Sequence, residues 1–260
     1  MSVLVLLPTY NERDNLPRLV PRILEHDGYR VLIIDDSSPD GTGDAADAMH
    51  RELPSRVSVL HRVRKDGLGR ACVAGMRRAL GEDPKHIIQM DADGSHNPAD
   101  LPRLVAAAAH NDLVLGSRYV KGGGIENWPR HRLALSTTAN RYVRLVTGID
   151  VRDCTAGFRC WRPALLRRLG IETLRSNGYG FQIETLYRAL KLGASVCEVP
   201  IVFTDRIEGR SKMSGRIMFE AALLPWRLRV RLGSLPPARI TRTDSNFDGA
   251  ELDARHTIQQ

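Results

Sequence analysis

Short apolar runs rich in β-branched residues alternate with helix-like segments, and this alternation constrains the fold more than any other feature. The runs lie at 3–7, 30–35, 57–60, 86–91, 112–117 and 195–203. Between the first five runs, amphipathic segments typical of helices lie at 14–25, 43–52, 68–80 and 99–109. Apolar strands that alternate with amphipathic helices are typical of a sheet covered on both faces. The sequence therefore predicts an α/β fold with a mostly parallel sheet flanked by helices.

The chain of 260 residues is long enough for one sizeable domain and a tail. Its first apolar run has no basic residues before it and no small-residue cleavage site, so we interpret it as a strand and not a signal peptide. No run approaches the roughly 18–20 apolar residues that cross a bilayer. We expect a catalytic domain at 1–213, a basic amphipathic segment at 214–235 and a disordered polar tail at 236–260.

The net charge of +8 is distributed unevenly along the chain. Residues 1–100 contain 13 Lys and Arg against 16 Asp and Glu, a net of −3, so the remaining residues carry +11. Such asymmetry indicates an anionic partner for the second half. Aromatic residues are only 5% of the composition and do not alternate with basic ones, which argues against a nucleic acid. Anionic lipids and phosphorylated substrates remain.

Carboxylate-bearing turns directly follow three of the predicted strands. They read PTYNE at 8–12, DDSSPDG at 35–41 and DADGSHNP at 91–98. Ligands of parallel α/β sheets bind at the carboxyl ends of the strands, so these turns are expected at one edge. Single residues such as Asp14 and Asn97 are explained as helix caps or turns. Several carboxylates gathered at one edge repel one another and require a cation.

Asp91 and Asp93 lie one residue apart at the end of the fourth run, and both can reach one hard divalent cation. Mg²⁺ and Mn²⁺ prefer oxygen ligands and are usually held by one or two carboxylates together with substrate phosphates. The pair therefore predicts a diphosphate ligand. A D-x-D pair alone is a weak signal, and its neighbours strengthen it.

Two neighbouring strand ends add features suited to a nucleotide. Asp35 and Asp36 can accept hydrogen bonds from ribose hydroxyls, as strand-end carboxylates do in dinucleotide-binding folds. Gly67 and Gly69 precede a helix, where a glycine backbone can approach a ligand closely. An ordinary glycine turn explains these two residues equally well.

Nine separated motifs resemble family 2 glycosyltransferases, and most closely the dolichol- or polyprenol-phosphate mannose synthases. They are PTYNE, IIDDSSPDGT, GLGRA, MDADGSHNP, GSRY, NWPRHRLALS, DCTAGFR, GFQIE and EGRSK, in the family's order and spacing across about residues 2–215. The resemblance implies a glycosyltransferase A-type fold. It also implies inverting transfer of mannose from GDP-mannose to a polyprenyl or dolichyl monophosphate, which gives a β-mannosyl phosphoryl polyprenol.

The resemblance also assigns the residues of the donor site. Those expected to line the guanosine pocket are Pro8, Tyr10, Glu12, Ile34 and Asp36, and those expected to hold Mg²⁺ or Mn²⁺ with the diphosphate are Asp91, Ala92 and Asp93. The family often has Gln two residues after the second Asp, where this chain has Ser95. Ser95 is therefore expected as a shorter metal contact, with water as the alternative.

The resemblance places basic residues at the phosphates of both substrates. The positions that match are Arg118, Arg132, Ser136, Arg206 and Lys212, of which Arg118, Arg206 and Lys212 are also expected to bind the donor. We expect Asp91, Asp93, Arg118, Arg132 and Ser136 to carry catalysis. A phosphate monoester has a second pKa near 6, so the acceptor is already anionic at neutral pH and needs no strong general base.

Asp153, Gln182 and Glu184 belong to the same motif set. A contact with the donor sugar, support of an arginine and a structural ion pair are all open for Asp153, so these residues are not assigned to the site.

The segment from 215 to 233 mixes large apolar residues, including a tryptophan, with arginines. Residues 206–242 contain nine Lys and Arg against two Glu. A basic segment with an apolar, Trp-bearing face is typical of a helix that rests on anionic headgroups, and a helix packed on the protein's own core is the alternative. Pro225 is expected to break or kink it. We expect a cytoplasmic protein, peripheral on the cytoplasmic membrane face, and leave a membrane-protein partner open.

Three other functions compete with this interpretation. A family 2 enzyme that passes glucose from UDP-glucose to a polyprenyl phosphate is the nearest. A nucleotide-sugar pyrophosphorylase should have a glycine-rich loop directly after the first strand, where this chain has PTYNE. A catalytically silent scaffold would not need the intact D-x-D pair and the basic residues.

Overall fold

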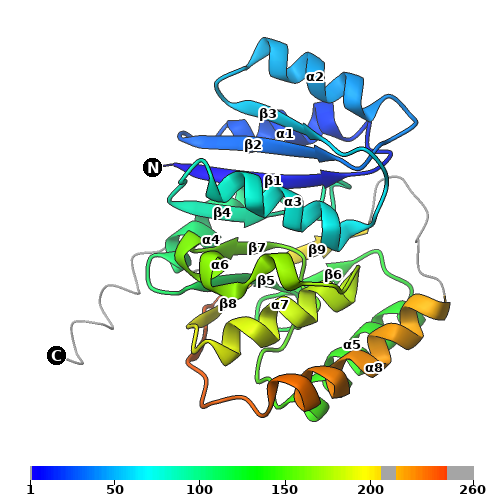
Figure 1. Ribbon diagram of the computed structural model, residues 1–260, viewed down its shortest axis with the longest axis vertical. Coiled ribbons are helices and arrows are strands. Elements are labelled where there is room, and N and C mark those ends of the chain that lie inside the picture. The colour runs from blue at the N-terminus through cyan, green and yellow to red at the C-terminus, as the bar shows by residue number, and fades with distance from the viewer. Residues whose placement is uncertain (1, 206–214, 245–260) are drawn as a thin grey trace.

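The computed structural model describes residues 2–205 and 215–244, with backbone only for 215–221. Its main sheet contains β1 (Val3–Thr9), β2 (Tyr29–Asp35), β3 (Val57–His61), β4 (His86–Gln89), β5 (Leu113–Ser117), β7 (Arg159–Trp161), β8 (Val196–Pro200) and β10 (Ile240–Arg242). The strand order is β10-β8-β5-β7-β4-β1-β2-β3 (Figure 1). β7 runs antiparallel to β4 and β5, and the other pairs are parallel. The predicted α/β fold with a mostly parallel sheet is confirmed.

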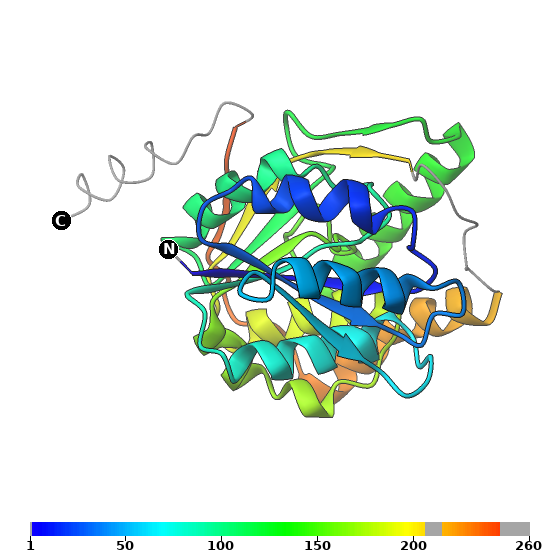
Figure 2. The ribbon, with the colours of Figure 1, turned by 90° about the horizontal axis from the view of Figure 1, so that it is seen from above.

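Helices cover both faces of this sheet (Figure 2). They are α1 (Leu16–Leu24), α2 (Thr42–Glu52), α3 (Leu68–Leu80), α4 (Leu101–Ala108), α5 (Arg130–Thr147), α6 (Pro163–Leu169), α7 (Tyr179–Lys191) and α8 (Gly215–Leu232), with short 3₁₀ turns at Pro98–Asp100 and Ile171–Thr173. Side chains of α1, α2 and α4 enter one core, and those of α3, α5, α6, α7 and α8 enter the other. The four helices expected from the apolar pattern correspond to α1 through α4.

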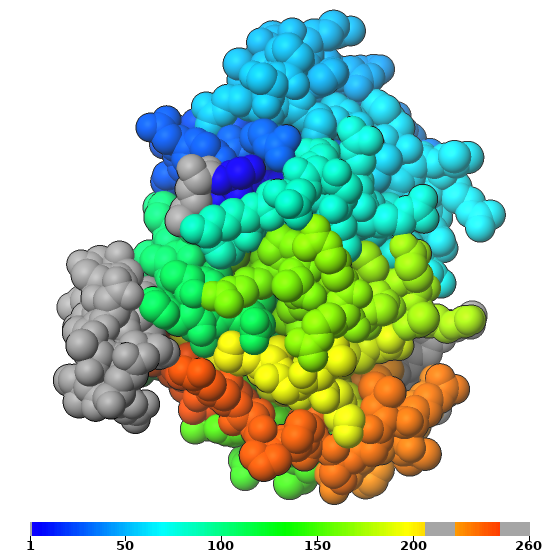
Figure 3. All heavy atoms as spheres, turned by 60° about the vertical axis from the view of Figure 1, so that its left-hand side comes forward, coloured from blue at the N-terminus to red at the C-terminus, as the bar shows by residue number. Residues whose placement is uncertain are grey.

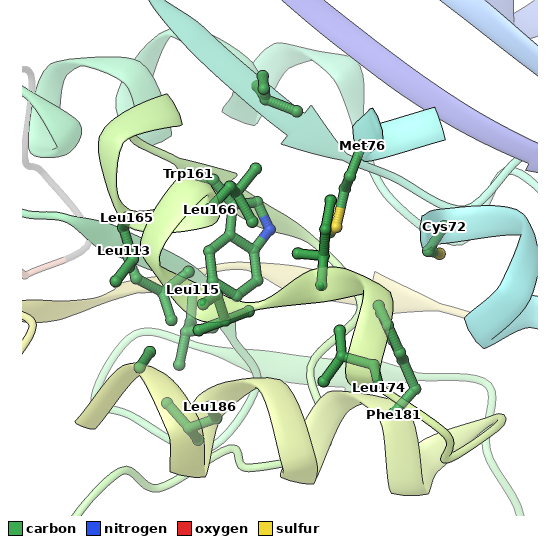
Figure 4. Close-up of a cluster of buried hydrophobic side chains, with 14 of the residues drawn as sticks. Cys72, Met76, Leu113, Leu115, Trp161, Leu165, Leu166, Leu174, Phe181 and Leu186 are labelled. Carbon is green, nitrogen blue, oxygen red and sulfur yellow. The ribbon is translucent and has the colours of Figure 1, made fainter. Parts of the chain in front are cut away.

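The continuous apolar strands supply both cores. In β1, Val3 and Val5 face the core of α1, while Leu4 and Leu6 face that of α3. Successive strand side chains point to opposite faces, so a strand covered on both sides must be apolar throughout. In the second core, Trp161 of β7 lies among side chains from the surrounding strands and helices (Figure 4).

The strand order brings several loops to one edge of the sheet. β1 pairs with β2 on one side and with β4 on the other, so the chain changes direction across the sheet at β1. The crevice at such a switch point, outside the carboxyl ends of the strands, is where open α/β sheets bind ligands. Because β7 is antiparallel, the loop before it, residues 153–158, lies at this same edge.

The predicted strand at 195–203 is two strands. β8 stays in the main sheet, while β9 (Val202–Thr204) pairs with β6 (Gly124–Glu126) in a small second sheet. The amide N–H groups of Ile201 and Gly124 hold the junction, donating to the carbonyls of Ser117 and Ile201. Continuous apolar character could not reveal this change of sheet.

The prediction of a disordered tail from residue 236 is wrong for β10. Ile240–Arg242 pairs with β8 in parallel, and the N–H of Thr243 donates to the carbonyl of Glu198 at 3.0 Å. An unpaired edge of β8 would expose its backbone groups, and β10 satisfies them. The rest of that tail, 245–260, and the expected domain boundary at 213/214 lie outside the described residues.

α8 packs on α5 and α7, with Leu228 in the core and Leu224 against it. In Figure 3 its orange atoms lie beside the yellow-green and yellow atoms of α7 and the residues after it. Of the expected break or kink at Pro225, the break does not occur, because the helix continues through this residue. Among 2–205 and 215–244, no helix has the length and apolar character needed to span a bilayer.

Candidate active site

A cavity of about 490 Å³ opens at the carboxyl edge of the sheet, within the usual range for small-molecule sites. Its wall combines the ends of β1, β2, β4 and β5 with the loops before β7 and α7. Nine of the predicted site residues line it: Pro8, Tyr10, Glu12, Asp36, Asp91, Ala92, Asp93, Arg118 and Arg132. Residues from both halves of the chain therefore meet in one cavity.

Three other predicted residues do not line this cavity. Ile34 is fully buried in the core, where its side chain contacts Gly75 of α3. Ser136 on α5 accepts a hydrogen bond from the Tyr119 hydroxyl at 2.7 Å. Ser95 is buried beside Asp93. Arg206 and Lys212 lie outside the described residues.

Asp91 follows β4 where the loop before β7 approaches it closely. A Cβ built on Gly157 would lie 3.2 Å from Asp91 Oδ2, so a larger residue would crowd the carboxylate. The Asp91 N–H donates to His96 Nδ1 at 3.2 Å. Burial lowers the pKa of His96 and outweighs the attraction of Asp91 and Asp93, which acts in the opposite direction. The lowered pKa favours the neutral ring, whose Nδ1 can accept this hydrogen bond. His96 also stacks on Phe158, with ring centroids 4.9 Å apart.

Asp93 is held by Ser95. The Ser95 Oγ and backbone N donate to Asp93 Oδ1 at 2.5 and 3.1 Å. The hydroxyl expected as a third metal ligand thus supports the second aspartate and does not face the cavity.

The two aspartates fit a divalent cation that is shared with a ligand. Within the described ranges, no group of three or more His, Cys, Asp and Glu side chains could hold a metal. A cation at Asp91 and Asp93 would need further oxygen ligands, and phosphate oxygens suit this need. The donor set matches a site that is completed by a bound diphosphate.

Asp36 organises the opposite wall. Its carboxylate accepts from Arg62 and from the backbone N–H groups of Asp66 and Gly67, the last two at 3.2 Å. These bonds hold the loop after β3 against the end of β2. Lys65 precedes Asp66 in this loop and lines the cavity. Its Nζ lies 3.5 Å from the centroid of the Tyr10 ring. Asp36 therefore shapes the pocket through this loop.

The glycines of this loop serve different purposes. Gly67 has a φ of +91°, in the region that favours glycine, and lines the cavity. A Cβ on Gly69 would lie 2.4 Å from the carbonyl oxygen of Ser176. The close approach at Gly69 is thus to the loop before α7 and not to a ligand.

Arg118 is a buried cation at the end of β5. Its Nε and Nη2 donate to the two carboxylate oxygens of Asp153 at 2.7 Å each, and Nη2 also donates to Thr155 Oγ at 2.8 Å. Burial favours the neutral guanidinium, but the attraction and hydrogen bonds of Asp153 outweigh it and raise the pKa of Arg118. Within the described part of the chain, Nη1 has no hydrogen-bond partner. A permanently charged group with open donors therefore lines the cavity.

Arg132 lies at the start of α5 and is half-buried. Its guanidinium is 4.0 Å from the centroid of the Trp128 ring, and Nη1 donates to Asp205 at 2.8 Å. Trp128 packs edge-on against Phe203, 5.5 Å away. The cavity thus has one deeply buried arginine and one more accessible arginine on an aromatic support.

Sequence reasoning missed several contributors to this site. Lys65, His96, Trp128 and Phe203 line the cavity without having been assigned to it. Trp128 lies in the motif NWPRHRLALS and His96 in the motif MDADGSHNP, so the motifs could have indicated that these two residues belong to the site. Asp153, for which three roles were open, makes a buried ion pair with Arg118.

Comparisons with known proteins agree with this geometry. A family model described as "Glycosyl transferase family 2" matches residues 4–174. The chain is 47% identical over 235 residues to a protein of Mycolicibacterium smegmatis named polyprenol monophosphomannose synthase, covering 88% of each chain. It is 46% identical over 246 residues to the undecaprenyl-phosphate mannosyltransferase of Micrococcus luteus, covering 90% of this chain and 100% of that one.

Two solved structures share the fold at low sequence identity. The mannosyltransferase PcManGT of Pyrobaculum calidifontis, in complex with GDP-Man and Mn²⁺, matches with a TM-score of 0.61 and 19% identity, covering 90% of this chain and 66% of that one. Glucosyl-3-phosphoglycerate synthase of Mycobacterium tuberculosis, with Mn²⁺, UDP and phosphoglyceric acid, matches with a TM-score of 0.62 and 19% identity, covering 90% and 80%. The expected glycosyltransferase A-type fold is confirmed.

Proposed function

The chain belongs to glycosyl transferase family 2, and from this premise we propose that it transfers mannose from GDP-mannose to a polyprenyl monophosphate. The product is a β-mannosyl phosphoryl polyprenol, which serves as an activated mannose donor for later mannosylation. Two relatives at 46–47% identity carry names that specify mannosyl transfer or a mannosylated polyprenol phosphate. These names support mannose as the sugar and a polyprenyl phosphate as the acceptor.

The observation that carries this proposal is the composition of the cavity. Asp91 and Asp93 lie in the same cavity as Arg118 and Arg132. Two carboxylates suit a cation-bound diphosphate, and arginines suit a phosphate because their donors match its oxygens. A reaction between a nucleotide diphosphate sugar and a lipid phosphate needs both the carboxylates and the arginines.

The reaction is a single displacement at the anomeric carbon of mannose. An oxygen of the lipid phosphate forms a bond to C1 while the bond from C1 to the GDP oxygen breaks, and GDP leaves with the electron pair. Arg118 and Arg132 neutralise the acceptor dianion and bring it to the back of the sugar. The acceptor carries no proton that must be removed, because its second pKa is near 6. One displacement inverts α-mannose to a β linkage.

Asp91 and Asp93 would hold a divalent cation, Mg²⁺ or Mn²⁺, in the part of the cavity assigned to the diphosphate. When bound, such a cation acts as a Lewis acid that stabilises the charge of the departing diphosphate. Complexes of both structural neighbours contain Mn²⁺, which supports a divalent metal. His96 and Ser95 keep the two aspartates oriented toward this role.

We place the protein on the cytoplasmic face of a membrane, where it meets its lipid. Trp226 and Val230 of α8 are exposed, as are the neighbouring Arg227 and Arg231. An exposed apolar and basic helix surface suits an anionic headgroup layer. We assign the catalytic domain to residues 1–213 and the interfacial segment to residues 214–235.

The nearest alternative is transfer of glucose from UDP-glucose to the same lipid. Complexes of the glucosyl-3-phosphoglycerate synthase neighbour contain UDP or UDP-glucose, so the fold itself accommodates both kinds of donor. Membership in a transferase family leaves the pyrophosphorylase and the scaffold without support.

A panel of radiolabelled nucleotide sugars, each offered with a short polyprenyl phosphate and Mg²⁺ or Mn²⁺, tests the proposal. We expect lipid labelling from GDP-mannose alone. The Asp91→Asn variant should lose about 10²-fold or more in kcat, the size typical of a lost electrostatic group. Labelling from UDP-glucose and not from GDP-mannose would overturn the donor assignment.

A further inference from the structure

Strand β10 is connected to the cavity by a series of polar contacts that pass through the buried Glu198. Arg242, in β10, donates through Nε to Glu198 Oε2 at 3.2 Å and through Nη2 to Asp150 Oδ2 at 3.1 Å. Glu198, in β8, is fully buried. Both residues lie after position 174, where the match to the family model ends.

Among the described residues, the carboxylate of Glu198 receives four hydrogen bonds. Its Oε1 accepts from Ser117 Oγ at 2.8 Å and from the Asp153 N–H at 3.0 Å. Its Oε2 accepts from the Arg152 N–H at 2.9 Å and from Arg242. Of these four donors, only Arg242 brings a full positive charge. A buried carboxylate is disfavoured when its paired cation is removed, so Arg242 stabilises the Glu198 side chain in this position.

Through these bonds, Glu198 fixes the backbone that carries Asp153. Asp153 is fully buried and grips the Arg118 guanidinium with both carboxylate oxygens. Asp153 Oδ2 also accepts from the Arg118 N–H at 3.1 Å. A shift of the backbone at 152–153 would therefore move the guanidinium that lines the cavity.

We propose that Arg242 and Glu198 are positioning residues, which act through Asp153 to hold the Arg118 guanidinium in place for the acceptor phosphate. This inference rests on the proposed function for the role of Arg118. Arg242 and Glu198 do not line the active-site cavity, so they act through the contacts above and not on substrate. β10 is accordingly a part of the active-site framework and not a dispensable extension.

The test compares Arg242→Gln with Arg30→Gln, the same substitution in a similarly exposed ion pair elsewhere in the sheet. Arg30 pairs with Glu82 at 2.9 Å, and its side chain is 34% exposed, as is that of Arg242. Arg30 lies at the start of β2, the end of the strand that is opposite the cavity. We expect Arg242→Gln to lower kcat/KM for polyprenyl phosphate about 10-fold, while Arg30→Gln lowers the melting temperature without this loss.

A double-mutant cycle separates positioning from a general loss of stability. In an Arg118→Lys background, Arg242→Gln should reduce kcat/KM less than about 2-fold further, because the group that it positions is already gone. Equal losses in both backgrounds would overturn the proposal. Arg242→Lys, which keeps a positive charge beside Glu198, should recover most of the activity. A folded Arg242→Lys protein that is as impaired as Arg242→Gln would also contradict the proposal.

A crystal structure of Arg242→Gln gives a readout that does not depend on mannosyl transfer. We expect Arg118 to lose its two-pronged contact with Asp153 or to occupy more than one position. An Arg118 that stays in place in this variant would overturn the positioning role even if mannosyl transfer is reduced. Absence of mannosyl transfer by the wild-type protein, with Arg118 displaced in the variant, would overturn the proposed function alone.

Discussion

The two arginines of the cavity differ in how firmly they are held. Arg118 and Asp153 are both buried, and removing one partner of such a pair costs about 3–5 kcal/mol because the other charge is left unpaired. The side chains of Arg132 and Asp205 are 30% and 31% exposed, and pairs of this kind contribute about 1 kcal/mol or less. Arg118 is therefore a fixed part of the site, whereas Arg132 can exchange Asp205 for a ligand phosphate at little cost.

Substituting Arg132→Gln should raise KM for polyprenyl phosphate by about 10-fold, since one charge-assisted phosphate contact is lost. The affinity for GDP, measured by calorimetry, and the melting temperature should change little. Arg130→Gln is the control, because Arg130 is exposed two residues away and does not line the cavity. Loss of GDP affinity equal to the loss of lipid use would contradict the acceptor role of Arg132.

Local residue patterns predicted the two aspartates of the candidate site. They did not predict the residues that hold Arg118 in place. Asp91 and Asp93 could be recognised because a strand end and a D-x-D pair are local features. Asp153 lies 35 positions from Arg118, and Glu198 a further 45 from Asp153. Only the pairing of β5 with β8 and β7 brings these residues together. No local pattern contains that information.

Among the elements, α8 packs on the protein core, which was one of the two alternatives expected for this segment. Leu224 and Leu228 pack toward the core, and Tyr142 and Arg229 donate hydrogen bonds between α5 and α8. Trp226, by contrast, is 54% exposed. One face of the helix is thus part of the protein core, and the other is exposed, as the proposed contact with a membrane surface requires.

The double variant Trp226→Ser, Val230→Ser should reduce association with anionic liposomes in a flotation assay. The lost contribution is apolar insertion, since the arginines of α8 remain. Leu53→Ser is the control: Leu53 is also exposed, and it follows α2, at the far end of the molecule from α8 (Figure 1). Unchanged flotation of the double variant would contradict the membrane role of this face.

β4 begins with a buried histidine that makes stability depend on pH. His86 is buried, and neither ring nitrogen has a hydrogen-bond partner in the described part of the chain. Burial, aided by the nearby charges of Lys85 and Arg162, lowers the pKa of His86 to about 4. In the unfolded chain the pKa is about 6.5. Between these values the unfolded chain binds a proton that the folded protein does not.

The free energy of unfolding should therefore fall as the pH falls from about 6.5 to about 4. His86→Leu removes this contribution, so the drop in melting temperature between pH 7 and pH 5 should be smaller in the variant than in the wild type. Thermal unfolding followed by circular dichroism measures both drops. An equal drop in the two proteins would show that His86 is not the group responsible.

At the scale of the elements, the strands and helices of the first half were predictable because each is a long, uninterrupted pattern. β7 and β10 were not, since each has only three residues and exists through its partners. β7 lies antiparallel between β4 and β5, and β10 covers the edge of β8. The missed strands are the ones that support the arginine side of the site.

Across the whole molecule, the uneven distribution of charge acquires a structural meaning. The acidic first half supplies Asp36, Asp91 and Asp93 to the cavity, and the basic second half supplies Arg118 and Arg132. The fold places a site suited to a cation and a diphosphate beside one suited to a second phosphate. Net charge alone predicted an anionic partner, but it could not show that both halves meet in one cavity.

The most direct test of this account is an anomalous difference map from crystals soaked with GDP and Mn²⁺. We expect one Mn²⁺ peak about 2.0–2.6 Å from a carboxylate oxygen of Asp91 or Asp93 and from oxygens of the GDP diphosphate. The guanosine should lie toward Tyr10 and the loop held by Asp36. A bound nucleotide whose diphosphate lies away from both aspartates would contradict the account.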